Sequence, residues 1–168
     1  MEKEKNKCQR CGTCCRKGPP GLHREDKRLY EQGILQKEHL LTLRREELVR
    51  DNVMDRTIRL PEEMIRIRSK RHEAACIFFD GKTSGCQIYG SRPLECRVLE
   101  CWDVSRIRRV YATERLARSD LFSPDSAIKQ IVDEHEEQCS YARVTELADR
   151  IRANAESDRP DLEELAGM

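Results

Sequence analysis

The chain carries a dense cysteine motif near its start, Cys8-Gln9-Arg10-Cys11-Gly12-Thr13-Cys14-Cys15. Three of these cysteines follow one another at intervals of three, so their thiolates can converge on one point when the backbone curls around it. This is the local geometry of iron–sulfur sites, in which a fourth cysteine comes from a distant part of the chain. A mononuclear zinc site more often combines one CxxC pair with a second pair elsewhere. The motif therefore predicts a metal site and leaves iron–sulfur and zinc both open.

The last two cysteines of the motif are adjacent, which limits how they can bind a metal. Neighbouring residues point in different directions, so Cys14 and Cys15 do not both ligate one tetrahedral ion without strain. One of them can instead serve a second metal or bridge two metals. Gly12 favours the tight backbone turn that such a loop needs, because glycine adopts conformations closed to other residues.

Five more cysteines follow after a long stretch that has none. Residues 16–75 contain no cysteine, and Cys139 stands alone near the C-terminal side. The other four are separated by nine, nine and four residues. They form no CxxC pair, which excludes an ordinary zinc ribbon with two similar knuckles. We therefore expect them to join the N-terminal motif. The candidate metal ligands are Cys8, Cys11, Cys14, Cys15, Cys76, Cys86, Cys96 and Cys101.

Composition indicates a small protein with a thin hydrophobic core. The chain has 168 residues, enough for one domain. Only 35 of them are Leu, Ile, Val or Phe, close to the one-fifth level below which chains tend to stay unfolded. The net charge of +1 argues against outright disorder, which needs high net charge as well. Structural zinc contributes roughly 10–16 kcal/mol in small domains, so metal ligation can replace part of the missing hydrophobic stabilisation.

Charge and hydropathy exclude several classes of protein and indicate a compartment. No apolar run approaches the roughly 20 residues that span a bilayer, and no apolar segment follows the charged residues 1–7. We therefore predict a cytoplasmic protein without a membrane partner, in which clustered thiols stay reduced and bind metal more often than they form disulfides. The near-zero net charge argues against a nucleic-acid partner, and a protein partner stays open.

Turn residues and hydrophobic periodicity predict the order of the elements in the first part of the chain. We expect a short helix over 24–32 that Gly33 ends, a strand over 64–68, and a β-hairpin with the arms Cys76–Asp80 and Gln87–Tyr89. The stretch 40–60 fits neither period cleanly. It favours extended structure, with a short helix as the alternative.

Three helices are expected in the second part of the chain. Ser91-Arg92-Pro93 and Ser123-Pro124 predict two helix starts, because serine caps helices and proline fits their first turn. After the second start, Ile128, Ile131, Val132 and His135 fall at i, i+3, i+4 and i+7. A further helix carries the apolar positions Tyr141, Val144, Leu147, Ala148 and Ile151.

These elements together predict an α+β fold, a small metal-stapled domain with a β-hairpin core and C-terminal helices. Residues 1–156 are expected to form a single cysteine-cluster metal-binding domain, and residues 157–168 a polar C-terminal tail. In the hairpin, Cys76 and Cys86 can face each other across the two strands. Cys96 and Cys101 follow on a helical segment.

One further pair and two further functions stay open at this point. His135 and Cys139 are spaced i, i+4 and can chelate a metal together, but His135 also ends an apolar stripe, which is typical of a core or boundary histidine. Cys139 fits a small buried hydrophobe equally well. Beside plain metal binding, the sequence leaves room for a metal-dependent redox or group-transfer enzyme, or for a zinc-stapled interaction module.

Four separated motifs resemble those of the CxxCxxCC cysteine-cluster family, the YkgJ-like proteins, which are described as zinc- or iron-chelating domains. The motifs are Cys8-x2-Cys11-x2-Cys14-Cys15, Cys76-Ile77-Phe78-Phe79-Asp80, Gly85-Cys86-Gln87-Ile88-Tyr89 and Arg92-Pro93-Leu94-Glu95-Cys96-Arg97. The resemblance covers roughly residues 8–101 and implies metal chelation by about eight cysteines. A related cysteine set occurs in flagellin lysine methylases, which keeps an enzyme open, although this chain has no glycine-rich nucleotide loop.

Overall fold

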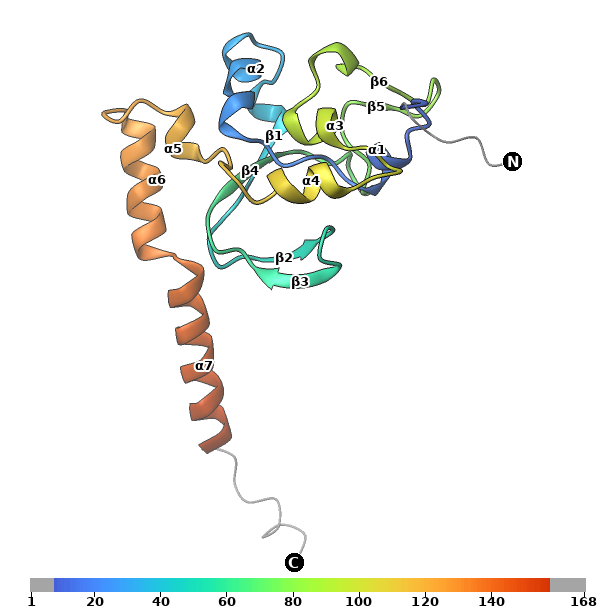
Figure 1. Cartoon of the computed structure of the whole chain (residues 1–168). Coiled ribbons are helices and arrows are strands. Elements are labelled where there is room, and N and C mark those ends of the chain that lie inside the picture. The colour runs from blue at the N-terminus through green and yellow to red at the C-terminus, as the bar shows by residue number, and fades with distance from the viewer. Residues whose placement is uncertain (1–7, 158–168) are drawn as a thin grey trace, which may run out of the picture. The chain divides into compact units, whose positions relative to one another are not determined.

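The structure of the protein is a computed structural model that describes residues 8–157 (Figure 1). Two compact units divide the chain, the first running to Pro124 and the second beginning at Asp125. A single domain over 1–156 stays a prediction. The predicted tail lies, apart from Ser157, outside the described residues. Among those residues, no helix combines the length and the apolar character that crossing a membrane would require.

Short helices open the first unit. Helix α1 spans Thr13–Lys17 and begins after Gly12, whose φ of 73° lies in the left-handed region that favours glycine. The 3₁₀ helix η1, Arg24–Asp26, continues directly into α2, Lys27–Glu31. The helix predicted over 24–32 is therefore confirmed.

Three antiparallel strand pairs follow, which confirms extended structure over most of 40–60. After the 3₁₀ helix η2, Lys37–His39, β1 (Leu40–Leu43) pairs with β4 (Met64–Ile67), and β2 (Leu48–Asp51) pairs with β3 (Arg56–Arg59). The third pair joins β5 (Phe79–Asp80) to β6 (Gly85–Cys86). Strand β4 is the strand predicted over 64–68, and its Ile65 and Ile67 are both buried.

The predicted hairpin exists, but its second arm and its cysteine pairing were wrong. The chain turns at Ser84, which has a φ of 51°, and returns at once as β6. Residues 89–91 instead form the 3₁₀ helix η3, Tyr89–Ser91. As a result Cys86 lies opposite Phe79, whereas Cys76 forms an isolated bridge with Ser69.

The helix predicted after Pro93 is confirmed but short. Helix α3 spans Leu94–Val98 and α4 spans Ser105–Val110, with a break that contains Cys101. Cys96 is therefore helical, and the expectation that Cys101 shares a helical segment was wrong. A further short helix, α5, spans Arg118–Leu121.

The core of the first unit gathers around β4 and the segment that leads into β5. Three chain segments meet there through backbone hydrogen bonds, from Leu22 N to Ile65 O (2.8 Å), Ile65 N to Leu116 O (2.7 Å) and Leu116 N to Leu22 O (2.9 Å). The buried core residues are Leu22, Leu29, Leu35, Ile65, Ile67, Ala75, Cys76, Phe78, Phe79 and Leu116. Cys15 and Cys86 pack against this core, so it lies directly beside thiols of the sequence motifs.

The described part of the second unit, residues 125–157, contains two helices, both predicted. Helix α6 spans Ala127–Gln138 and α7 spans Tyr141–Ser157. The start of α6 was wrong by a few residues, because the hydroxyl of Ser126, not Ser123, accepts a hydrogen bond from Lys129 N at 3.2 Å and caps the helix. The α+β class is confirmed by the whole set of elements.

Candidate metal centre

Five cysteines from four segments of the first unit lie close enough for their charges to interact. They are Cys14 and Cys15 on α1, Cys76 before β5, Cys86 on β6 and Cys96 on α3, and we call them the thiol cluster. Figure 1 shows α1, α3 and the β5–β6 hairpin gathered in the same part of this unit. Sulfurs separated by as many as 82 positions in the sequence are thereby brought together.

Close backbone packing holds α1 against the segment that carries Cys76. The Cys76 N–H donates a hydrogen bond to the Cys15 carbonyl at 2.8 Å. At the start of α1, a Cβ on Gly12 would lie 2.8 Å from Phe79 Cζ, so the ring packs directly on the glycine. The Arg16 guanidinium covers the same ring, 4.7 Å from its centroid, and donates to the Cys11 carbonyl at 3.0 Å. The N-terminal motif thus packs against the core at Phe79 of β5.

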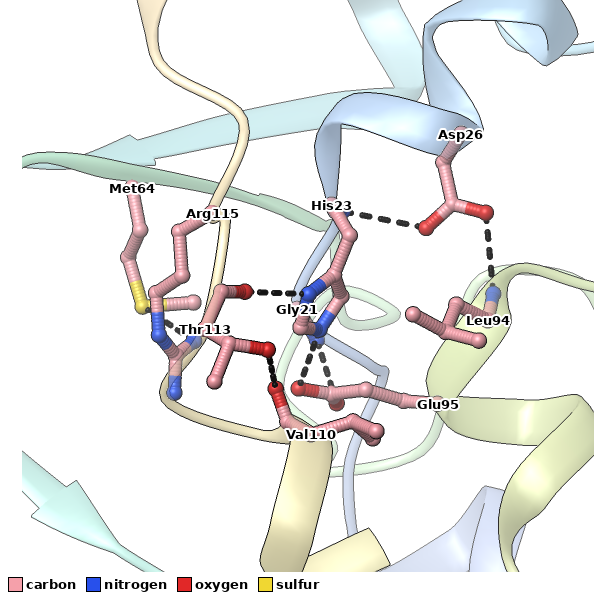
Figure 2. A network of polar contacts seen from close by, with 9 residues as sticks. All are labelled: Gly21, His23, Asp26, Met64, Leu94, Glu95, Val110, Thr113 and Arg115. Carbon is pink, nitrogen blue, oxygen red and sulfur yellow. Dashed lines mark hydrogen bonds and ion pairs between the residues drawn. The ribbon is translucent and has the colours of Figure 1, made fainter.

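A buried polar network fixes the helix that carries Cys96 (Figure 2). The Asp26 carboxylate is fully buried and accepts hydrogen bonds from His23 N at 3.0 Å and Leu94 N at 2.9 Å. Leu94 is the first residue of α3, whose free N–H groups need acceptors. Burial raises the pKa of the Asp26 carboxyl, and its backbone donors oppose that rise. A carboxylate from η1 therefore caps α3.

The neighbouring Glu95 links the same helix to a buried histidine. Glu95 accepts from Gly21 N at 2.8 Å and lies 3.4 Å from His23 Nε2. His23 Nδ1 lies 2.7 Å from the Thr113 carbonyl. Both partners of the ring are acceptors, which favours the doubly protonated imidazolium. Burial lowers the pKa of His23, but the bond to Glu95 and its charge outweigh this, and the net pKa is raised.

Arginine contacts complete the surroundings of the cluster. Arg92 donates to the Cys96 carbonyl at 3.3 Å and to the Tyr89 carbonyl at 3.0 Å, and its guanidinium lies 3.9 Å from the centroid of the Tyr89 ring. The positive charge of Arg92 lowers the pKa of Cys86, and that of Arg66 lowers the pKa of Cys76. Neither arginine overcomes the effect of burial.

Four thiols of the cluster, those of Cys15, Cys76, Cys86 and Cys96, are hard to ionise without a cation. Burial raises the pKa of Cys15 to about 12, and the neighbouring thiols add to that rise. Burial likewise raises the pKa of Cys76 and Cys86, and that of Cys96 lies well above its usual range. A metal cation reverses this balance, because it binds the thiolate and neutralises the charges that repel one another. The donor set therefore fits a thiophilic cation.

The remaining predicted ligands, Cys8, Cys11 and Cys101, are exposed and are not among the five thiols of the cluster. Within residues 8–157, no three His, Cys, Asp or Glu side chains are already arranged as metal ligands, so the cluster would have to close further around an ion. In the second unit, His135 and Cys139 are both exposed, and the interpretations of a core histidine and a buried cysteine were wrong.

A family model with the description "CxxCxxCC: Putative zinc- or iron-chelating domain" matches residues 7–140. The chain belongs to this family. The resemblance seen in four sequence motifs is thereby confirmed, and the match also covers the whole of α6. No curated protein and no solved structure matches the chain.

Sequence reasoning missed the polar network that positions α3 in this CxxCxxCC protein. His23 stayed unassigned, and Asp26 was treated only as part of a short helix. Their partners Leu94 and Glu95 lie roughly seventy residues away. No periodic pattern connects the two segments. The one available signal was Glu95, a charged residue directly before a predicted ligand.

Proposed function

We propose that this protein holds a metal centre through cysteine thiolates, with the thiol cluster supplying the inner ligands. The exposed cysteines Cys8, Cys11 and Cys101 complete the set of eight candidates. The observation that carries the proposal is the mutual interaction of five thiols from four separate segments. Membership in a family described as zinc- or iron-chelating agrees with it.

The number of donors bears on the kind of centre. A structural zinc site takes four ligands, and an iron–sulfur cluster is likewise held by four cysteines. Five clustered thiols exceed that number, so one thiol is spare or the centre contains more than one metal. The adjacent Cys14 and Cys15 suit a bridging arrangement, because the first of them is exposed and the second half-buried. Zinc and an iron–sulfur centre both satisfy the proposal.

A reducing compartment such as the cytoplasm suits this centre. Within the described residues, none of the nine cysteines forms a disulfide, and oxidation of clustered thiols would remove the ligands. We therefore place the protein in the cytoplasm as part of the proposal.

Metal analysis of protein purified under anaerobic conditions tests the proposal. Brown protein with broad visible absorption and bound iron would identify an iron–sulfur centre. Colourless protein with stoichiometric zinc would identify a zinc site. A folded protein that contains neither metal, and takes up neither on addition, would overturn the proposal.

A further inference from the structure

A small cavity in the first unit is lined by three arginines. Its volume is about 190 Å³, and Arg28 of α2 and Arg92 and Arg97 of the region around α3 contribute to its wall. Pockets for drug-sized ligands measure about 300–1,000 Å³, so this cavity suits a much smaller molecule. Gln32 and Ser91 add polar side chains to the lining.

The charge of this arginine cavity is only partly compensated. Arg97 forms an ion pair with Glu25. Within the described part of the chain, Arg28 and Arg92 have no carboxylate partner, and the exposed Arg28 side chain has no hydrogen bond. The wall of the cavity thus contains two arginines without a carboxylate partner. A ligand with two negative charges would balance their charge.

The arginines are also prepared to donate hydrogen bonds. Each guanidinium has five N–H donors. Arg92 donates hydrogen bonds to the Tyr89 and Cys96 carbonyls. Arg97 donates to the Glu25 carboxylate and to the Arg92 carbonyl, the latter at 3.1 Å. These contacts hold two of the three guanidinium groups in place and leave other donors free. The fold therefore orders these donors before a ligand binds, which lowers the conformational entropy that binding would cost.

We propose that the arginine cavity binds a phosphate group, either as the free ion or as a small phosphomonoester. A phosphate carries between one and two negative charges near pH 7 and several strong acceptor oxygens. Planar guanidinium groups recognise such oxygens in paired hydrogen bonds. Three arginines that converge on a small cavity match this chemistry better than that of a neutral molecule. The cavity adjoins the thiol cluster through Arg92, which also donates to the Cys96 carbonyl.

Titration of the purified full-length protein with inorganic phosphate tests the proposal. Isothermal calorimetry at about 0.1 M sodium chloride is expected to show one saturable site per chain. A parallel titration with glycerol 3-phosphate distinguishes the two forms of ligand. Tighter binding of the ester identifies a phosphomonoester site, and binding of phosphate alone identifies a site for the free ion.

Two charge-matched variants separate a built site from general electrostatic attraction. Arg28→Gln removes the unpartnered arginine and is expected to weaken binding at least about tenfold. Arg56→Gln removes another exposed arginine, which lies on β3 outside the cavity, and is expected to leave binding unchanged. Metal content and circular dichroism check that both variants fold. The proposal is overturned by absence of saturable binding, by unchanged binding in Arg28→Gln, or by equal losses in the two variants.

Discussion

Gly12 shows how a single residue constrains the cysteine motif. Its φ of 73° is a left-handed conformation, and the Phe79 ring occupies the space where a side chain would begin. The glycine lies between Cys11 and Cys14, so the turn that it permits decides how the motif approaches the core. Backbone and packing requirements therefore coincide at one position.

Substitution of Gly12 by alanine is expected to destabilise the protein by at least about 2 kcal/mol. A left-handed conformation costs a residue with a side chain about 1–2 kcal/mol, and the contact with Phe79 adds an overpacking cost. Chemical denaturation measures the change in the free energy of unfolding.

Gly33→Ala is the matched control for this substitution. Gly33 has nearly the same φ, 71°, but a Cβ there meets no atom within 4 Å. We expect it to lose only the conformational part, about 1 kcal/mol. Equal losses in the two variants would show that the Phe79 contact is unimportant.

At the scale of elements, η1 and α3 are joined by buried charges. Asp26 accepts a hydrogen bond from Leu94 N and so caps the first turn of α3. His23 lies within ion-pair distance of Glu95, the second residue of α3. Because Cys96 follows Glu95 directly, these contacts set the position of one thiol of the cluster. The network thus connects the fold to the candidate metal centre.

The His23–Glu95 contact predicts a dependence of stability on pH. The pKa of His23 is raised above its ordinary value of 6.5, so the folded state binds the proton more tightly than the unfolded state. The stabilisation is complete below pH 6.5 and is lost as the pH rises through the raised pKa. We therefore expect the stability advantage of the wild type over His23→Gln to shrink as the pH rises above 6.5.

The difference between the two proteins isolates this histidine from other titrating groups. Asp26, whose pKa burial also raises, is present in both proteins and is not changed by the substitution. His135→Gln, a substitution of an exposed histidine on α6, controls for the loss of a histidine outside this network. A difference between the wild type and His23→Gln that stays constant with pH would contradict the ion pair.

At the scale of the whole molecule, the sequence predicted the elements better than their meeting points. Alternation placed the strand around Ile65 and Ile67, and helical spacing placed α6 and α7. The cysteine motifs named every member of the thiol cluster. Strand register and helix caps depend on single contacts, which hydrophobic periodicity does not reveal. The second hairpin arm and the start of α6 were misplaced for this reason.

Long-range polar contacts were the least predictable part of the molecule. The carboxylate of Asp26 reaches Leu94 across 68 positions, and the arginine cavity combines residues from α2 with residues around α3. Such pairs leave no local pattern in the sequence, because a charged residue is ordinarily predicted to be exposed to solvent. The candidate metal ligands were easier to predict, because so dense a set of cysteines is rarely explained by anything other than metal binding.

The central claim is that thiols from distant segments of the first unit hold one metal centre together. Its most direct test is the metal content per chain of Cys11→Ser, Cys86→Ser and Cys139→Ser, purified side by side without oxygen. Cys139 is exposed and lies in the second unit, so its variant controls for the loss of any one thiol. The account predicts that the first two variants lose the metal and that Cys139→Ser keeps it. Full metal content and unchanged stability in both Cys11→Ser and Cys86→Ser would contradict the shared centre.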